Sequence, residues 1–140
     1  MAIFVRPADW QTERDSIRAI RQAVFVEEQK VPADLEWDNQ EESSQHFLVF
    51  QGGAAVGTGR LTQAGKIGRM AIDKKVRGQG LGAELLKAIF EYAQQQGYRQ
   101  IFLHAQQQAQ GFYSKAGFSA EGKVFFEAGI PHIKMVQNLS

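Results

Sequence analysis

A glycine-rich loop joins an apolar stretch to an amphipathic one, and this junction constrains the fold more than any other part of the sequence. Residues 67–72 are apolar and few enough to form one strand, and after the loop apolar residues recur at helical spacing from Leu81 until Gly97. The loop between them, residues 74–82, contains three cationic side chains and three glycines. The sequence therefore predicts a strand that leads through this loop into the first turn of a helix.

Such a junction is suited to binding phosphate groups. Glycine adopts left-handed backbone conformations, which can turn neighbouring N–H groups toward one point. The unpaired N–H groups at a helix start and the positive end of the helix dipole attract anions. The side chains of Lys74, Lys75 and Arg77 add positive charge around the same place. We interpret the loop as a pyrophosphate-binding site; the alternative is a basic loop whose glycines only make turns.

Two common phosphate-binding patterns fit this loop incompletely. A P-loop requires lysine followed by serine or threonine after its last glycine, but here Gly82 is followed by alanine and glutamate. The dinucleotide-binding pattern is met in its looser form, Gly-x-Gly-x-x-Ala over residues 78–83, and would indicate a nicotinamide-dependent oxidoreductase. That pattern places its first glycine directly after a strand, whereas five residues separate Gly78 from Ile72.

A third class matches residue by residue. The sequence Arg-Gly-Gln-Gly-Leu-Gly at residues 77–82 resembles the Gln/Arg-x-x-Gly-x-Gly/Ala motif of the GNAT acyl-CoA N-acyltransferases, which lies between the fourth strand and third helix of that fold. Residues 111–118 are similar to the family's second signature, the fourth helix and its exit. Residues 25–38 and 127–132 resemble a branch of small, poorly characterised bacterial GNAT proteins. The resemblance implies that acetyl-CoA binds at the loop.

The resemblance also implies roles for individual residues. In the GNAT family the loop holds the phosphates, the fourth strand holds the pantetheine arm and supports the thioester carbonyl, and a tyrosine of the fourth helix often protonates the departing thiolate. Tyr113 is therefore the expected general acid, beside the sulfur; the alternative is packing with Phe112 in the core. The other expected donor-binding residues are Met70, Ala71, Ile72, Lys75, Arg77, Gly78, Gln79, Gly80, Leu81 and Gly82.

The acceptor side needs a base, because an alkylamine with a pKa of about 10.4 is protonated at neutral pH. Glu28, Glu36 and Asp38 precede the second predicted strand on the side expected for the acceptor; the alternative is a solvated acidic loop. His104 ends a strand, where it would face the ligand or hydrogen-bond the backbone, and His132 begins one. We expect catalytic roles for Glu28 and His104, and acceptor binding by Glu36, Asp38 and His132.

The predicted elements follow the GNAT order. A strand–helix–strand connection of this length makes its two strands parallel and gives the crossover a right-handed sense. We therefore expect an α/β (α+β) fold: a mixed, mostly antiparallel seven-stranded sheet with a central parallel strand pair, and four helices, in one domain over residues 1–140. The expected strands are residues 3–5, 46–50, 55–61, 67–72, 100–104, 118–127 with a break at Gly122, and 132–136.

Composition limits the partners. A chain of 140 residues with 44% hydrophobic and 22% charged residues is typical of a globular protein, and a net charge of +1 favours neither nucleic acid nor membrane. The absence of cysteine excludes disulfides and a cysteine nucleophile, and three scattered histidines do not predict a metal site. Residues 1–6 show no signal-peptide pattern and no apolar run is long enough to span a bilayer, so we expect a cytoplasmic protein.

The sequence thus predicts an acetyl-CoA-dependent N-acetyltransferase without a metal. It would acylate a primary amine of a small molecule or a lysine-like peptide acceptor by direct attack in a ternary complex, and the acidic residues predict a preference for cationic amines. The alternatives are an acyl-CoA-binding regulatory module without turnover and the oxidoreductase fragment. A homodimer is compatible with the sequence, which leaves the acceptor, the acyl-chain preference and the oligomeric state open.

Overall fold

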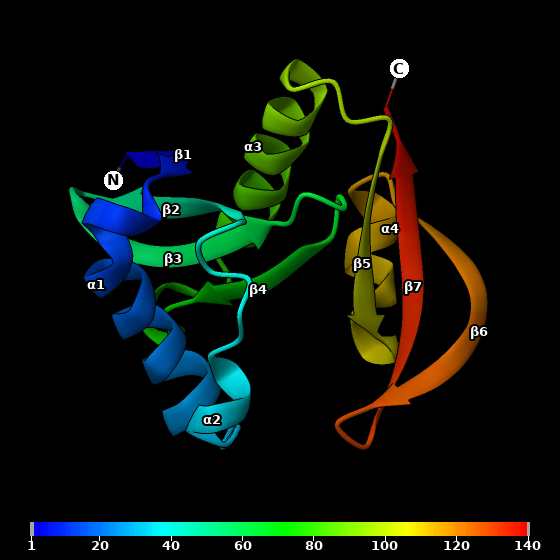
Figure 1. Ribbon diagram of the computed structural model, residues 1–140, viewed down its shortest axis with the longest axis horizontal. Helices are drawn as coiled ribbons and strands as arrows, with labels where there is room; N and C mark the ends of the chain where they lie inside the picture. Colours follow the sequence, from blue (N-terminus) through cyan, green and yellow to red (C-terminus); the bar gives the residue numbers. More distant parts are fainter. Residues whose placement is uncertain (1, 140) are drawn as a thin grey trace.

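The computed structural model describes residues 2–139, apart from the side chains of residues 34 and 35. It contains two antiparallel sheets whose facing edges meet at one point and then diverge (Figure 1). The first sheet has the strand order β1-β2-β3-β4 and the second the order β5-β7-β6. The strands are β1 (Ile3–Ala8), β2 (Gln45–Gln51), β3 (Ala54–Leu61), β4 (Ile67–Ile72), β5 (Gln100–Gln106), β6 (Ser119–Glu127) and β7 (Ile130–Asn138).

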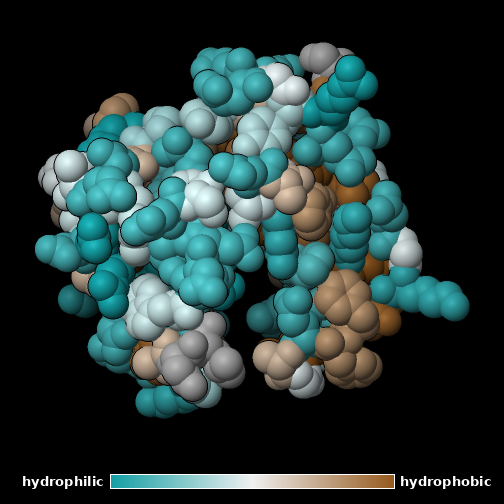
Figure 2. Space-filling model, in the orientation of Figure 1, coloured by the Kyte–Doolittle hydropathy of each residue, from teal (hydrophilic) through white to brown (hydrophobic). Residues whose placement is uncertain are grey.

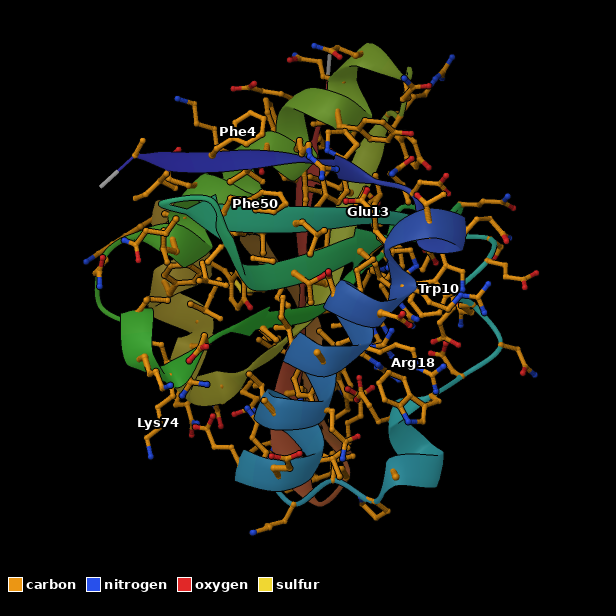
Figure 3. The ribbon with its side chains drawn as sticks, turned by 90° about the vertical axis from the view of Figure 1, so that its left-hand side faces the viewer. Phe4, Trp10, Glu13, Arg18, Phe50 and Lys74 are labelled. Atoms are coloured by element: carbon orange, nitrogen blue, oxygen red, sulfur yellow. The ribbon has the colours of Figure 1, made fainter. Side chains whose placement is uncertain are left out.

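Two long helices and several short helical segments cover the sheets. The helix α1 crosses one face of the first sheet (Figure 3). No helix within residues 2–139 has the length and apolar character needed to cross a membrane. The helical elements are α1 (Trp10–Arg21), the π-helical η1 (Gln22–Glu28), α2 (Ala33–Glu36), the 3₁₀ turn η2 (Lys74–Val76), α3 (Leu81–Gln95), the 3₁₀ turn η3 (Gln107–Ala109) and α4 (Gln110–Lys115).

Alternate residues of β2 point to opposite faces of the first sheet and pack into two separate core clusters, one with α1 and one with α3. Successive side chains of a strand point to opposite faces. Phe47 and Val49 are fully buried in a cluster with α3, whereas Leu48 is buried in a second cluster with Ile17 of α1. The α3 cluster also takes in Met135 from the second sheet. The helix α3 therefore packs against both sheets and holds them together.

The facing edges of the two sheets are β4 and β5, which begin side by side and then separate. One parallel bridge pairs Lys66 with Phe102, and the Phe102 N–H donates to the Gly65 carbonyl at 2.9 Å. Past this bridge no ladder joins the two strands within residues 2–139, and Figure 1 shows them diverging. We call this divergence the wedge. In Figure 2 the surface is hollowed between the two halves of the molecule.

This arrangement corrects the expectation of one seven-stranded sheet with a central parallel pair: there are two sheets, and the parallel contact is a single bridge. The cause is a bulge in β4. Thr58 lies opposite Ala71 but Arg60 lies opposite Gly68, so β4 carries an extra residue there, and Arg69 has a φ of +49°. A bulge bends its strand and increases the local twist, which turns the carboxyl end of β4 away from β5.

Candidate active site

A cleft of about 360 Å³ opens at the carboxyl end of β4, beside the first turn of α3. Most of the residues expected to bind the donor line it. The cleft also includes Val24 of η1 and Phe112 of α4, which the sequence did not identify as site residues. The expected donor-binding residues in its wall are Met70, Ala71, Ile72, Arg77, Gly78, Gly80, Leu81 and Gly82.

The first turn of α3 presents unpaired amides to this cleft. Gly80 is the N-cap and provides no side-chain cap. The first intrahelical bond runs from the Glu84 N–H to the Gly80 carbonyl at 3.2 Å. Within residues 2–139 the N–H groups of Leu81, Gly82 and Ala83 have no acceptor. Amides in this position, at the positive end of a helix dipole, form an anion-binding site.

The glycines of the loop leave space above its backbone. Gly78 and Gly80 have φ values of +81° and +82°, in the left-handed region, and no heavy atom lies within 4 Å of the place where a Cβ would stand at either position. A phosphate group can therefore approach the backbone closely at both residues. The loop fits the diphosphate of an acyl-CoA on these grounds.

The other expected donor-binding residues lie outside the cleft wall. Lys75 is exposed, and its backbone N–H donates to the Asp73 side chain at 3.0 Å. The Gln79 side chain accepts a hydrogen bond from Gln51 at 2.7 Å, which connects the loop to the end of β2. Figure 3 shows Lys74 directed outward from the same loop. Both lysines are therefore exposed charges on the loop that leads into the anion site.

Arg77, which lines the cleft, forms an ion pair with Glu28, which lies outside its wall. Both terminal guanidinium nitrogens of Arg77 donate to the Glu28 carboxylate at 2.6 Å, and Nε donates to the Ile72 carbonyl at 2.9 Å. Hydrogen bonding by Arg77 holds the pKa of Glu28 below its ordinary value. Glu28 is therefore ionised, but its carboxylate is already hydrogen-bonded to Arg77. The same ion pair engages the guanidinium of Arg77.

Replacing Glu28 with glutamine should strengthen acetyl-CoA binding about three- to fivefold. The amide releases the charge of Arg77 for the donor phosphates, and the gain is small because exposed ion pairs contribute little. Isothermal titration of both proteins measures the change. The matched control is Glu27→Gln, an exposed neighbour in η1. Weaker binding by the Glu28 variant would show instead that this ion pair organises the loop.

Glu36 and Asp38 lie in a cluster with three arginines from α1, β3 and β4. Arg21 Nε donates to the Glu36 carboxylate at 2.7 Å, and these side chains are only 1% and 4% exposed. Arg60 donates to both oxygens of Asp38, at 2.9 and 2.6 Å, and Arg69 lies 3.2 Å from one of them. The hydrogen bonds from Arg60 hold the pKa of Asp38 well below its usual range.

This placement changes the role assigned to the acidic segment. The carboxylate of Glu36 is buried against arginines and belongs to the scaffold rather than to an acceptor-binding surface. Asp38 is partly exposed, but arginines already neutralise its charge. Among the pockets of the described residues, none is lined by Glu28, Glu36 and Asp38 together: Asp38 lines one hollow with Glu41 and Glu42, and Glu28 lines another. The preference for cationic amines stays a prediction.

His104 and His132 share the face of the second sheet that is turned away from α3 and α4. Leu103 and Ala105 of β5 are buried on the helix-covered side, so His104 between them points the opposite way. His132 of β7 lies opposite Gln106, two residues along β5 and thus on the same face as His104. The structure brings together these two histidines, one expected to act in catalysis and the other in acceptor binding.

Tyr113 of α4 lies on the other side of β5, where its partly buried ring packs against the core. Its ring lies 5.1 Å from that of Phe112 and 6.2 Å from that of Phe118. Burial raises the pKa of its hydroxyl, so the phenol stays protonated at neutral pH. The hydroxyl has no hydrogen-bond partner within residues 2–139. Both the packing role and the supply of a proton are compatible with this position, whereas Phe112 is 43% exposed and reaches the cleft.

Several known proteins are similar to this chain in sequence and fold. Residues 11–139 match the profile of the acetyltransferase (GNAT) domain. In Bacillus subtilis, the uncharacterised protein YyaT is 40% identical over 137 residues, covering 92% of this chain and 93% of YyaT. The uncharacterised N-acetyltransferase YjcF of the same organism is 39% identical over 123 residues, covering 85% and 88%. A proposed N-acetyltransferase from Lactobacillus plantarum superposes with a TM-score of 0.91 over the whole of both chains, at 32% identity. The chain therefore belongs to the GNAT family of acyl-CoA N-acyltransferases.

Proposed function

We propose that the chain transfers the acetyl group of acetyl-CoA to a primary amine by direct attack in a ternary complex. The observation that carries this proposal is the position of the unpaired α3 amides at the carboxyl end of β4, where the wedge opens. A diphosphate bound at these amides leaves the pantetheine arm free to run along β4 into the wedge. The relative YjcF, described as an N-acetyltransferase, supports acetyl as the acyl group.

The chain offers backbone groups to both parts of the donor. The N–H groups of Leu81, Gly82 and Ala83 would bind the diphosphate, with Lys75 adding positive charge nearby. Past the Lys66–Phe102 bridge, β4 is the edge strand of its sheet within the described residues, so its backbone on the wedge side has no strand partner. Backbone groups of Met70 to Ile72 can therefore bind the pantetheine amides and the thioester oxygen.

The two sides of β5 supply different proton-transfer groups. The amine nitrogen attacks the thioester carbon, the C–N bond forms and the C–S bond breaks; one proton leaves the amine and one must reach the thiolate. We assign Tyr113, on the α4 side, as the proton donor to the thiolate. We assign His104, on the uncovered face, as the base, because a neutral imidazole accepts a proton near pH 7. Glu28 is engaged by Arg77 and is the less suitable base.

A panel of acceptors tests the proposal. Small primary amines, polyamines, amino acids and lysine peptides are incubated with acetyl-CoA, and free CoA is measured together with the mass of the product. We expect at least one amine to gain an acetyl group. We also expect acetyl-CoA, but not NAD, to raise the melting temperature. Stabilisation by acetyl-CoA without any acetylated product would indicate the binding module instead.

Replacing Tyr113 with phenylalanine should lower kcat by roughly 10²-fold, the lower end of what general acid catalysis supplies. The interaction forms only as the C–S bond breaks, so acetyl-CoA affinity should stay within a few-fold and stability should change little. Steady-state kinetics from pH 6 to 9 measure the effect. Tyr98→Phe is the matched control, because the Tyr98 hydroxyl lies away from the cleft and donates to the Thr62 carbonyl at 3.3 Å. An unchanged kcat for the Tyr113 variant would leave that residue with a packing role only.

A further inference from the structure

One carboxylate lies between the two histidines of the uncovered sheet face. Glu127 Oε1 is 3.1 Å from Nδ1 of His104, and Glu127 Oε2 is 3.7 Å from Nε2 of His132. The first distance is a hydrogen bond and the second is too long for one. No group of three potential metal ligands among the described residues is arranged to hold an ion. The carboxylate therefore acts on His104 directly and on His132 only through its charge.

The strand register explains why these three residues meet. In an antiparallel pair, directly opposed residues share a face of the sheet. His132 lies opposite Gln106 of β5 and opposite Phe125 of β6, so residues two positions from these partners share its face. His104 is two residues from Gln106, and Glu127 is two residues from Phe125. Three strands thus contribute one side chain each to the same surface.

The two histidines differ in what remains available to a ligand. His132 is 7% exposed, its Nδ1 lies 2.7 Å from the Ile130 carbonyl, and its ring stacks on Phe125 at 6.0 Å. His104 is 26% exposed, and within residues 2–139 only its Nδ1 has a hydrogen-bond partner. The His132 ring is therefore held in place by its neighbours, whereas Nε2 of His104 is free to accept a proton.

The other charged group near His104 is directed elsewhere. Lys134 lies opposite His104 in the β5–β7 register. Its Nζ is 4.9 Å from the centroid of the Phe102 ring and 3.4 Å from the Glu121 carboxylate. The rings of Phe125 and His104 form a T-shaped pair with their centroids 5.0 Å apart. Glu127 is therefore the one carboxylate within the described residues that contacts this imidazole.

We propose that Glu127 is a positioning residue that holds His104 as the Nδ1–H tautomer, so that Nε2 can take the proton of the acceptor amine. This proposal rests on the proposed function. When the amine attacks the thioester, the C–N bond forms and the amine proton moves to Nε2, while the C–S bond breaks and Tyr113 protonates the departing thiolate. The Glu127 carboxylate stabilises the resulting imidazolium, and Tyr113 regains its proton from water. A carboxylate that orients an imidazole and balances its charge is a known device for general bases. The proton passes to water after the product leaves.

The test compares Glu127→Gln with Glu121→Gln. Glu121 lies on the same strand, is similarly exposed, and pairs with Lys134 rather than with a histidine. The ¹⁵N chemical shifts of the His104 ring, recorded while the imidazole is neutral, report the tautomer without needing an acceptor. We expect mainly the Nδ1–H form in the wild type and the Glu121 variant, and a mixture of both forms in the Glu127 variant.

Kinetics supply the second readout. The Glu127 variant should lose roughly 10-fold in kcat, a part of the 10²–10⁴ that a general base contributes, with an unchanged KM for acetyl-CoA. An unchanged tautomer ratio would overturn the proposal, and so would a changed ratio with unchanged kcat. If the proposed function is wrong, the wild-type protein will give no acetylated product with any amine. The nitrogen spectra test the Glu127–His104 contact whether or not an acceptor is found.

Discussion

Replacing Glu36 with alanine should lower the free energy of unfolding by about 3–5 kcal/mol, because it leaves a buried arginine without its main counter-ion. The guanidinium of Arg21 is 1% exposed and makes two short contacts to Glu36, at 2.7 Å to the carboxylate and 2.8 Å to the carbonyl. Its remaining carboxylate partner is Glu41, at 3.4 Å. Urea unfolding at neutral pH measures the loss as a lower midpoint with an unchanged slope.

Two controls separate this effect from the loss of any ion pair. Glu121→Ala removes an exposed pair with Lys134 and should cost at most about 1 kcal/mol. The double variant Arg21→Met/Glu36→Leu removes both buried charges and should be more stable than Glu36→Ala, since apolar residues often replace a buried pair at little cost. A single Glu36 variant that unfolds at the wild-type urea concentration would show that water solvates Arg21 at this position.

The buried pair fixes the segment that follows η1 against the first sheet. The guanidinium groups of Arg18 and Arg21 lie 4.9 and 4.7 Å from the centre of the Trp37 ring, a distance suited to cation–π attraction. Figure 3 shows Arg18 on the side of α1 that faces this segment. Asp38 continues the attachment through Arg60 of β3. The acidic segment is thus anchored at three consecutive residues, 36 to 38.

Local patterns in the sequence identified the donor loop, whereas the ion pairs join residues far apart in the chain. A glycine-rich stretch between a strand and a helix predicts an anion site because the chemistry lies within a few residues. Glu28 and Arg77 are separated by 49 positions, and Asp38 and Arg60 by 22. When the arginine partner of a carboxylate lies so far away in the chain, the sequence does not reveal the ion pair. The carboxylate is then interpreted as a solvated or substrate-binding group. Glu36 and Asp38 were accordingly assigned to acceptor binding, and Glu28 was assigned to catalysis.

The order of strands was predictable from apolar periodicity, but the division into two sheets was not. The division depends on the bulge in β4, where the non-glycine residue Arg69 adopts a φ of +49°. Non-glycine residues seldom take this conformation, and no local pattern announces it. Gly59 lies opposite the bulge, and its lack of a side chain allows α3 to pack closely there. A Cβ at this position would stand only 3.2 Å from Leu85 of α3 and 3.3 Å from Met70. The wedge therefore follows from tertiary packing of α3 against a bent strand.

Replacing Gly80 with aspartate should weaken acetyl-CoA binding by about 100-fold or more. The carboxylate would stand in the open space above the loop and repel the diphosphate, and like charges placed together at a binding surface cost several kcal/mol. At the N-cap of α3 it would also compete for the amides that we assign to the phosphates. Titration calorimetry measures the affinity. Thermal unfolding checks it independently, since ligand at 100 times its dissociation constant stabilises a protein by about 2.7 kcal/mol.

Gly53→Asp separates this repulsion from backbone strain. Gly53 has a φ of +86° against +82° for Gly80, and no heavy atom lies within 4 Å of either Cβ position, but Gly53 belongs to the β2–β3 turn and does not line the cleft. Both variants therefore place an aspartate in the left-handed region and should lose similar stability, because the strain is the same. Only the Gly80 variant should lose the stabilisation by acetyl-CoA. Equal stabilisation of both variants would mean that the phosphates bind away from this loop, and with it the placement of the thioester between β4 and β5 would have to be abandoned.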